Sequence, residues 1–210
     1  TLIPKFPLGC RRILLSDDYY PALQRDNVTL ETTPIERLDS NSVVTTTGAH
    51  HYIDCLVAAT GFHSHDFLPA VEVTGLGKAD LHNQWENKGG AEAYLGIAVS
   101  GFPNLFFLYG PNTNLGHSSI IFMIECQVHY ILKTIGLLNK RGGKTIEITH
   151  NSMEEFNQAI KKKLQHTAWA GSCNSWYKSA QGKIINNWST HTVGYWLRTR
   201  RPIANHYRVK

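Results

Sequence analysis

The stretch Tyr52-Ile53-Asp54-Cys55-Leu56-Val57-Ala58-Ala59, followed directly by Thr60-Gly61-Phe62, decides the predicted fold. An apolar run that narrows to two alanines and ends in Thr-Gly is typical of a central strand in a parallel sheet. Open α/β sheets bind their cofactors at the carboxyl ends of such strands. A second strand of this kind is predicted over Leu105–Tyr109, before Gly110-Pro111-Asn112. Two such strand ends in one chain predict a dinucleotide-binding site.

The composition is that of an ordinary globular protein. The chain has 210 residues, of which 42% are hydrophobic and 18% charged, and its net charge is +5. No apolar stretch is expected to be long enough to span a bilayer, and the first residues lack the layout of a signal peptide, so no stable membrane anchor is predicted. The basic tail over 198–210 carries no recognisable nucleic-acid module, so no nucleic-acid partner is expected.

The cysteines and histidines give no sign of a metal site. Cys55 and Cys126 lie within apolar runs and are expected to be buried, reduced thiols, which favours a reducing, cytoplasmic setting. Cys10 and Cys173 stand far from both. The close histidine pairs at 50–51 and at 63 and 65 have no matching cluster at zinc spacing, so no metal is predicted.

The remaining elements follow from periodicity and turn residues. The apolar positions from Ile120 to Ile135 fall at helical spacing, so a strong helix is predicted from Ser118 to Leu138. Residues 62–96 are predicted to form a long functional loop, and the end of the chain to be irregular. The other predictions are a short helix over 17–23, a strand and a hairpin over 28–46, a strand over 145–149, and a helix opened by a capping box at Ser152.

The order of these elements is unusual. A doubly wound nucleotide-binding domain opens with a strand, a Gly-rich turn and a helix, but Gly-x-Gly-x-x-Gly occurs nowhere in this sequence. The chain has later strands of such a domain without the first. That order predicts the C-terminal portion of a larger enzyme.

Several motifs, in order, resemble the Baeyer–Villiger and related class B flavin monooxygenases. Residues 7–12, 18–20 and 27–28 resemble the late nicotinamide-domain segment of that family, and 54–62 is similar to its return strand into the FAD domain. Residues 94–97, 101–106 and 110–112 resemble its flavin-side segment, and Ser175-Trp176-Tyr177 with Gly182-Lys183 its C-terminal stretch. The family's two Gly-rich fingerprints and its His-containing signature are absent here.

The resemblance implies a fold class and a division of the chain. The fold is expected to be α/β, a partial flavoprotein fold with two dinucleotide-binding (Rossmann-like) domains that lacks its N-terminal Gly-rich strand-turn-helix units. Residues 1–50 would end the NADPH-binding domain, 51–140 would form the returning half of the FAD-binding domain, and 141–210 would add its C-terminal strand, helix and wrapping segment.

The resemblance also implies a reaction with FAD and NADPH as cofactors. Reduced FAD would activate O2 as a C4a-peroxyflavin, and one oxygen atom would be inserted into a small-molecule ketone. Arg12 aligns with the arginine that stabilises the charged species, and Arg11 with a basic residue that meets the NADPH 2′-phosphate. An exposed basic pair with no special role is the alternative for both.

The remaining candidate cofactor-binding residues lie at the two strand ends and at one helix start. The backbone of Thr60, Gly61 and Phe62 is expected to pack against FAD, while Pro111 and Asn112 would line its ring. Ser118 and Ser119 open a helix whose positive end would face the flavin, and simple capping explains them equally well. The loop 62–68 and the turn 113–117 would border the flavin face.

Other readings stay open at this point. Oxygenation of nitrogen or sulfur on the same scaffold is a close alternative to ketone oxidation. The isolated chain is expected to be inactive without the missing N-terminal part of the enzyme, and a catalytically inert truncated domain is the alternative of a different class. Exposed strand edges are expected to make the chain poorly soluble or oligomeric.

Overall fold

The computed structural model describes residues 3, 5–62, 64, 66–173 and 175–210, which form two compact units. The smaller unit is Ile13–Phe62. The larger unit joins the segment that ends at Arg12 to the residues that follow Phe62. This division differs from the predicted one at residue 50, but it reflects packing alone, so the assignment of segments to cofactor domains stays a prediction.

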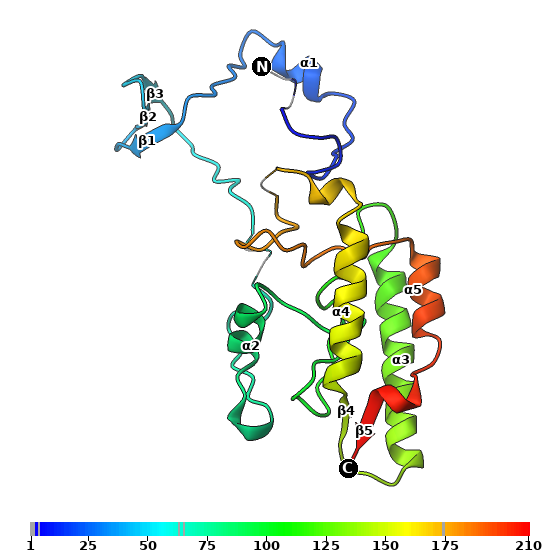
Figure 1. Cartoon of the computed structure of the whole chain (residues 1–210). Coiled ribbons are helices and arrows are strands. Elements are labelled where there is room, and N and C mark those ends of the chain that lie inside the picture. Colours follow the sequence, from blue (N-terminus) through cyan, green and yellow to red (C-terminus); the bar gives the residue numbers. More distant parts are fainter. Residues whose placement is uncertain (1–2, 4, 63, 65, 174) are drawn as a thin grey trace. The chain divides into compact units, whose positions relative to one another are not determined.

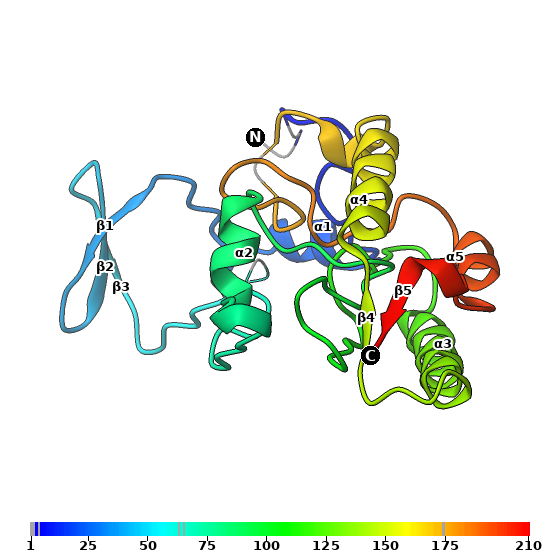
Figure 2. The ribbon, with the colours of Figure 1, turned by 60° about the horizontal axis from the view of Figure 1, so that its bottom comes forward.

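The smaller unit is a helix and a three-stranded antiparallel sheet. Helix α1 (Tyr19–Leu23) precedes β1 (Ile35–Leu38), β2 (Ser42–Thr45) and β3 (His50–Tyr52), which pair in the order β1-β2-β3 (Figure 2). The predicted short helix and hairpin are therefore confirmed. The predicted strand over 28–31 does not form.

The run that follows β3 corrects the prediction of a central buried strand. Residues 53–62 are in no strand, Val57 is 81% exposed and Phe62 is 99% exposed. A central strand of a parallel sheet needs a hydrogen-bonded neighbour on each side, and the described residues supply none for this run. Cys55 is exposed for the same reason, whereas Cys126 is buried as expected.

The larger unit is built from helices around irregular segments (Figure 1). Its helices are α2 (Leu81–Asn87), α3 (Ile120–Lys140), α4 (His150–Leu164) and α5 (Thr192–Thr199), with 3-10 turns at 76–78, 168–170 and 204–206. Strand β4 (Ile146–Ile148) pairs antiparallel with β5 (Tyr207–Val209). Because α2 lies inside the predicted long loop and α5 in the predicted irregular end, those two predictions are wrong.

Side-chain caps fix where the two long helices begin. The hydroxyl of Ser119 accepts from the N–H of Phe122 and starts α3, as predicted. Thr149 accepts from the N–H of Ser152, so α4 begins two residues before the predicted capping box. By length and composition alone, α3 is apolar enough to cross a membrane, which corrects the expectation that no stretch is.

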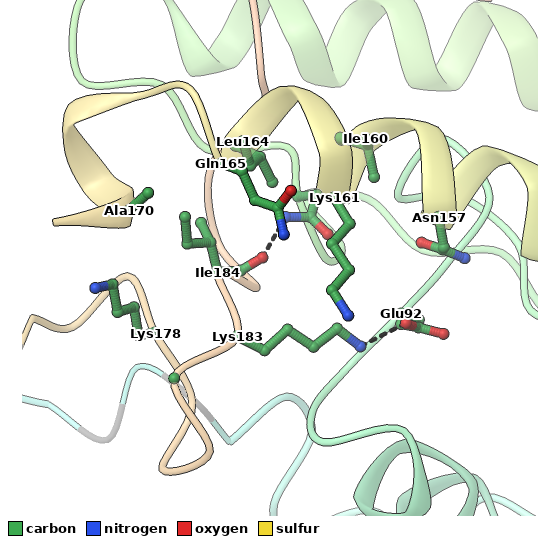
Figure 3. A pocket seen from close by; sticks show the side chains of 12 residues that line it. Glu92, Asn157, Ile160, Lys161, Leu164, Gln165, Ala170, Lys178, Lys183 and Ile184 are labelled. Carbon is green, nitrogen blue, oxygen red and sulfur yellow. Dashed lines mark hydrogen bonds and ion pairs between the residues drawn. The ribbon is translucent and has the colours of Figure 1, made fainter. Parts of the chain in front are cut away.

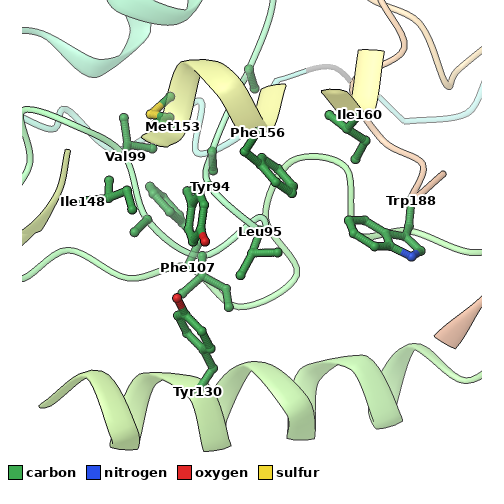
Figure 4. Close-up of a cluster of buried hydrophobic side chains, with 14 of the residues drawn as sticks. Tyr94, Leu95, Val99, Phe107, Tyr130, Ile148, Met153, Phe156, Ile160 and Trp188 are labelled. Atoms are coloured by element: carbon green, nitrogen blue, oxygen red, sulfur yellow. The ribbon is translucent and has the colours of Figure 1, made fainter. Parts of the chain in front are cut away.

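The core of the larger unit lies between α3, α4 and the buried segment 91–99 (Figure 4). Tyr94 packs edge-on against Phe156 of α4, and the hydroxyl groups of Tyr130 and Tyr207 share a hydrogen bond of 3.0 Å. Burial raises the pKa of the Tyr130 phenol, so this pair stays neutral. The core therefore ties α3 to β5.

The second predicted strand, over 105–109, is also absent. Its middle residue Phe107 is buried, but Tyr109 has a left-handed φ of 56° that a strand does not allow. No neighbouring strand among the described residues pairs with this segment. It ends in a turn rather than at a sheet edge.

Candidate functional site

The turn 110–113 is held by a close approach of two loops. Gly96 has a φ of 68°, and a Cβ there would lie 2.8 Å from the Pro111 carbonyl oxygen and closer still to the Thr113 side chain. A Cβ on Gly110 would collide with the Gly96 carbonyl. Both positions therefore require glycine, because only hydrogen fits between the two backbones.

A buried polar network holds the same turn from the side of α3. The side-chain oxygen of Gln127, on α3, accepts from the N–H of Tyr109 at 2.8 Å. Its amide nitrogen donates to the hydroxyl of Tyr195 on α5 at 3.0 Å, and that hydroxyl donates to the Leu95 carbonyl at 2.7 Å. Gln127 thus links two helices to both loops.

A pocket of about 310 Å³ opens beside this turn. Gly110, Tyr109 and Asn114 line it from the turn, and Phe67 and Trp176 line it from two other segments. The Tyr109 hydroxyl donates to the Asn114 side-chain oxygen at 2.8 Å. Parts of the predicted loop 62–68 and turn 113–117 therefore meet at one pocket, although the histidines at 63 and 65 lie outside the described residues.

Arg12 and Arg11 have different surroundings. Burial raises the pKa of the phenols of Tyr109 and Tyr177, and the Arg12 cation opposes the rise at both. The guanidinium of Arg11 lies 4.6 Å from the centre of the Phe6 ring in a cation–π contact. The two arginines are therefore not equivalent, although the sequence shows them as a pair.

The other predicted residues of the turn and the helix start are fixed by structural bonds. The Asn112 amide donates to the carbonyls of Ile184 and Asn187 at 2.9 and 3.1 Å, and Asn112 is buried like Pro111. Ser118 donates to Thr192 at 3.3 Å, while Ser119 caps α3. These hydrogen bonds give Asn112, Ser118 and Ser119 a structural role, and their contact with a cofactor stays a prediction.

Thr60, Gly61 and Phe62 belong to the smaller unit, where all three are exposed. Gly61 has a φ of 87°, a conformation that favours glycine. Their packing against a cofactor stays a prediction.

A second cavity, of about 180 Å³, contains an ion pair (Figure 3). The Lys183 ammonium lies 2.5 Å from the Glu92 carboxylate and also donates to the carbonyls of Lys88 and Gly90. Burial lowers the pKa of Lys183, and Glu92 opposes this. The predicted Gly182-Lys183 motif thus anchors the segment that follows Trp176 to the end of α2.

A disulfide joins Cys10 to Cys173 across 163 residues of sequence. Both cysteines are buried, so the reduced state favoured from the sequence does not apply to them. Four widely spaced cysteines gave no signal for this pair. Gln127 carried no motif either, since a glutamine in apolar surroundings is typical of a core helix.

The pocket has features that suit the edge of a flat, anionic ring. Aromatic side chains line two of its sides, the backbone of Gly110 is bare, and Arg12 brings a positive charge near. The first N–H groups of α3 have no partner within the helix, and its positive end lies a few residues after the turn. The residues therefore fit a flavin or nicotinamide ring.

Comparisons with known proteins cover nearly the whole chain. No protein-family model matches it. The FAD-binding monooxygenase ktnD of Aspergillus niger is 41% identical over 200 residues, which are 93% of this chain and 32% of that protein. A Baeyer-Villiger monooxygenase of Pseudomonas aeruginosa is 37% identical over 208 residues, 98% of this chain and 39% of that protein.

A solved structure agrees with these relatives. An oxidized steroid monooxygenase bound to NADP superposes with a TM-score of 0.84 at 28% identity, over 98% of this chain and 40% of the other. The chain therefore spans 32% to 40% of the length of the proteins that it matches here.

Proposed function

We propose that this chain, which corresponds to a C-terminal portion of the Baeyer–Villiger type of flavin monooxygenase and has part of their two-dinucleotide-binding-domain fold, forms one wall of an oxygenation site. The whole protein would insert one oxygen atom from O2 into a small-molecule ketone with FAD and NADPH. The observation that carries this proposal is the pocket lined by Tyr109, Gly110 and Trp176.

In this proposal, FAD supplies the activation of O2 and this chain supplies position and charge. Arg12 is the residue that meets developing negative charge, because a guanidinium stays cationic and offers a planar fork of donors. The Arg12 cation opposes the rise in the pKa of the Tyr109 and Tyr177 phenols, which supports this role.

The other residues would bind and orient the two cofactors. Gly110 gives close access to backbone, and Trp176 gives a flat surface for a ring. Arg11 would meet the NADPH 2′-phosphate after leaving Phe6, and Thr60-Gly61-Phe62 would close against FAD. Residues 1–50 would then end the NADPH domain, while 51–140 and 141–210 would belong to the FAD domain.

The proposal also includes the setting of the whole protein. The rest of the enzyme would supply the Gly-rich turns for the two pyrophosphates, since none occurs here. A cytoplasmic location would give access to NADPH.

The test is Arg12→Ala in the complete FAD-loaded enzyme. We expect the flavin absorbance to remain and ketone-dependent oxygenation to fall by at least about a hundredfold, as for loss of one preorganised charge-stabilising group. Arg25→Ala, an exposed arginine of the smaller unit, is the matched control and should keep full activity. Product formation at the original rate by the Arg12 variant would refute the role.

A further inference from the structure

We propose that the Cys10–Cys173 disulfide is the positioning element for the segment that carries Arg12, so that reduction of this one bond frees that segment from the rest of the larger unit. The catalytic part of this inference rests on the function proposed above. The structural part, that the bond holds the first segment of the chain in place, does not.

The disulfide joins two segments that are far apart in sequence. The Cα atoms of Cys10 and Cys173 are 6.3 Å apart, and the two side chains are 0% and 8% exposed. Arg12 follows the first cysteine by two residues. Trp176, which lines the pocket, follows the second by three. Each half of the bond therefore leads directly into a residue of the site.

Little else holds this segment. Among the described residues, no hydrogen bond or ion pair joins residues 3–12 to the rest of the larger unit. The Cys10 N–H bonds only to the Pro7 carbonyl, within the same turn. The remaining contacts are van der Waals ones, such as Pro7 and Cys10 beside Gly171 and the Gly9 backbone beside Ala168. A few such contacts are weak compared with the entropy of a free chain end.

The first segment of the larger unit ends at Arg12, and the next residue belongs to the smaller unit. Among the described residues, the disulfide is therefore the cross-link that joins the segment carrying Arg12 to the rest of the larger unit.

Reduction is a thiol–disulfide exchange with a dithiol. A thiolate of the dithiol attacks one sulfur, the Cys10–Cys173 bond breaks, and a mixed disulfide forms. The second thiol of the reagent closes it to a cyclic disulfide, so the protein gains two electrons and two protons as two free thiols. A low-molecular-weight disulfide of the glutathione type reverses the reaction.

The first experiment measures hydrogen exchange of the chain, oxidised and after treatment with dithiothreitol, with Cys10→Ser and Cys173→Ser as variants. We expect exchange of the amide of residue 10, which is buried and hydrogen-bonded to Pro7, to rise at least tenfold in the reduced protein and in both variants, while the amides of α3 stay protected. Cys55→Ser, which changes an exposed free cysteine, should leave that amide protected. Unchanged protection of the residue 10 amide after complete reduction would overturn the inference.

The second experiment uses the complete FAD-loaded enzyme. We expect Cys10→Ser to lower kcat at least tenfold with unchanged FAD content, and the double variant with Arg12→Ala to lose no more activity than Arg12→Ala alone. Additive losses would mean that the disulfide does not act through Arg12. If the enzyme oxygenates nothing, the proposed function fails, and the exchange experiment still decides whether the bond holds the segment.

Discussion

Removing the Gln127 network tests how the candidate site is held, and the structure gives the size of the effect. Gln127→Leu keeps the side-chain volume but leaves the Tyr109 N–H without its acceptor. Tyr195→Phe leaves the Gln127 amide and the Leu95 carbonyl without partners. An unsatisfied buried group costs about 1–3 kcal/mol, so Gln127→Leu, with one such group, should lose about 1.5 kcal/mol of unfolding free energy and Tyr195→Phe, with two, about 3 kcal/mol.

The double variant separates the shared bond from the rest. In it, the orphaned amide of Gln127 no longer exists, so the loss should be about 3 kcal/mol rather than about 4.5 kcal/mol, a coupling of about 1.5 kcal/mol. Urea unfolding, followed by tryptophan fluorescence, measures the unfolding free energy of the unsubstituted protein, the two single variants and the double variant. Gln158→Leu, on the exposed face of α4, is the control and should change stability by less than about 0.5 kcal/mol. Strict additivity of the two losses would refute the network.

Three further predictions concern the anchors of the larger unit. Lys183→Met should lower the unfolding free energy by about 3 kcal/mol in urea, because it leaves a nearly buried carboxylate unpaired; an unchanged midpoint would contradict this. Gly96→Ala should lower the unfolding free energy by about 3 kcal/mol, because it adds both backbone strain and a collision. Gly182→Ala, whose Cβ would meet open space, should lower it by only about 1 kcal/mol. Equal shifts in melting temperature would show that the two backbones can move apart. The hydrogen bond from Lys88 lowers the pKa of Glu154, and that bond raises the pKa of Lys88. The Lys88–Glu154 ion pair should therefore add less than about 1 kcal/mol to the unfolding free energy. This contribution is present above the ordinary carboxyl pKa and is lost as pH falls below it. Glu154→Gln should therefore shift the melting temperature at pH 7 but not at pH 3.

Local patterns predicted the elements that depend on local physics. The apolar spacing from Ile120 and the hydroxyl of Ser119 placed α3 to within two residues, because a helix closes its own hydrogen bonds. The hairpin of the smaller unit was predicted for a similar reason, since its strands are neighbours in sequence.

The predictions of two central strands were wrong because a strand forms only where neighbouring strands pair with it. The runs at 53–59 and 105–109 have the composition of buried parallel strands, but parallel partners come from elsewhere in a fold. The chain spans only part of the proteins that it resembles, and the described residues offer no partner for either run. The composition of these two runs is therefore typical of strands in a larger sheet than the described residues form.

The candidate site was predicted in part. The Gly110 turn, the loop up to Leu68 and Arg12 were singled out from the resemblance, and the structure gathers the first two at one pocket with Arg12 near it. The roles of Gln127 and of the Cys10–Cys173 bond were invisible, because each depends on a partner more than 60 residues away along the chain.

The pairing of β4 with β5 has a consequence for how the protein is made. Until Tyr207 has been synthesised, Ile148 has no strand partner and the Tyr130 hydroxyl has no partner for its hydrogen bond to Tyr207. A ribosome adds residues one at a time and covers the most recent ones in its exit tunnel, so the core of the larger unit closes only after β5 has emerged. Until then α3 and α4 expose apolar faces, and messages cut short before residue 207 should yield products that chaperones and proteases remove.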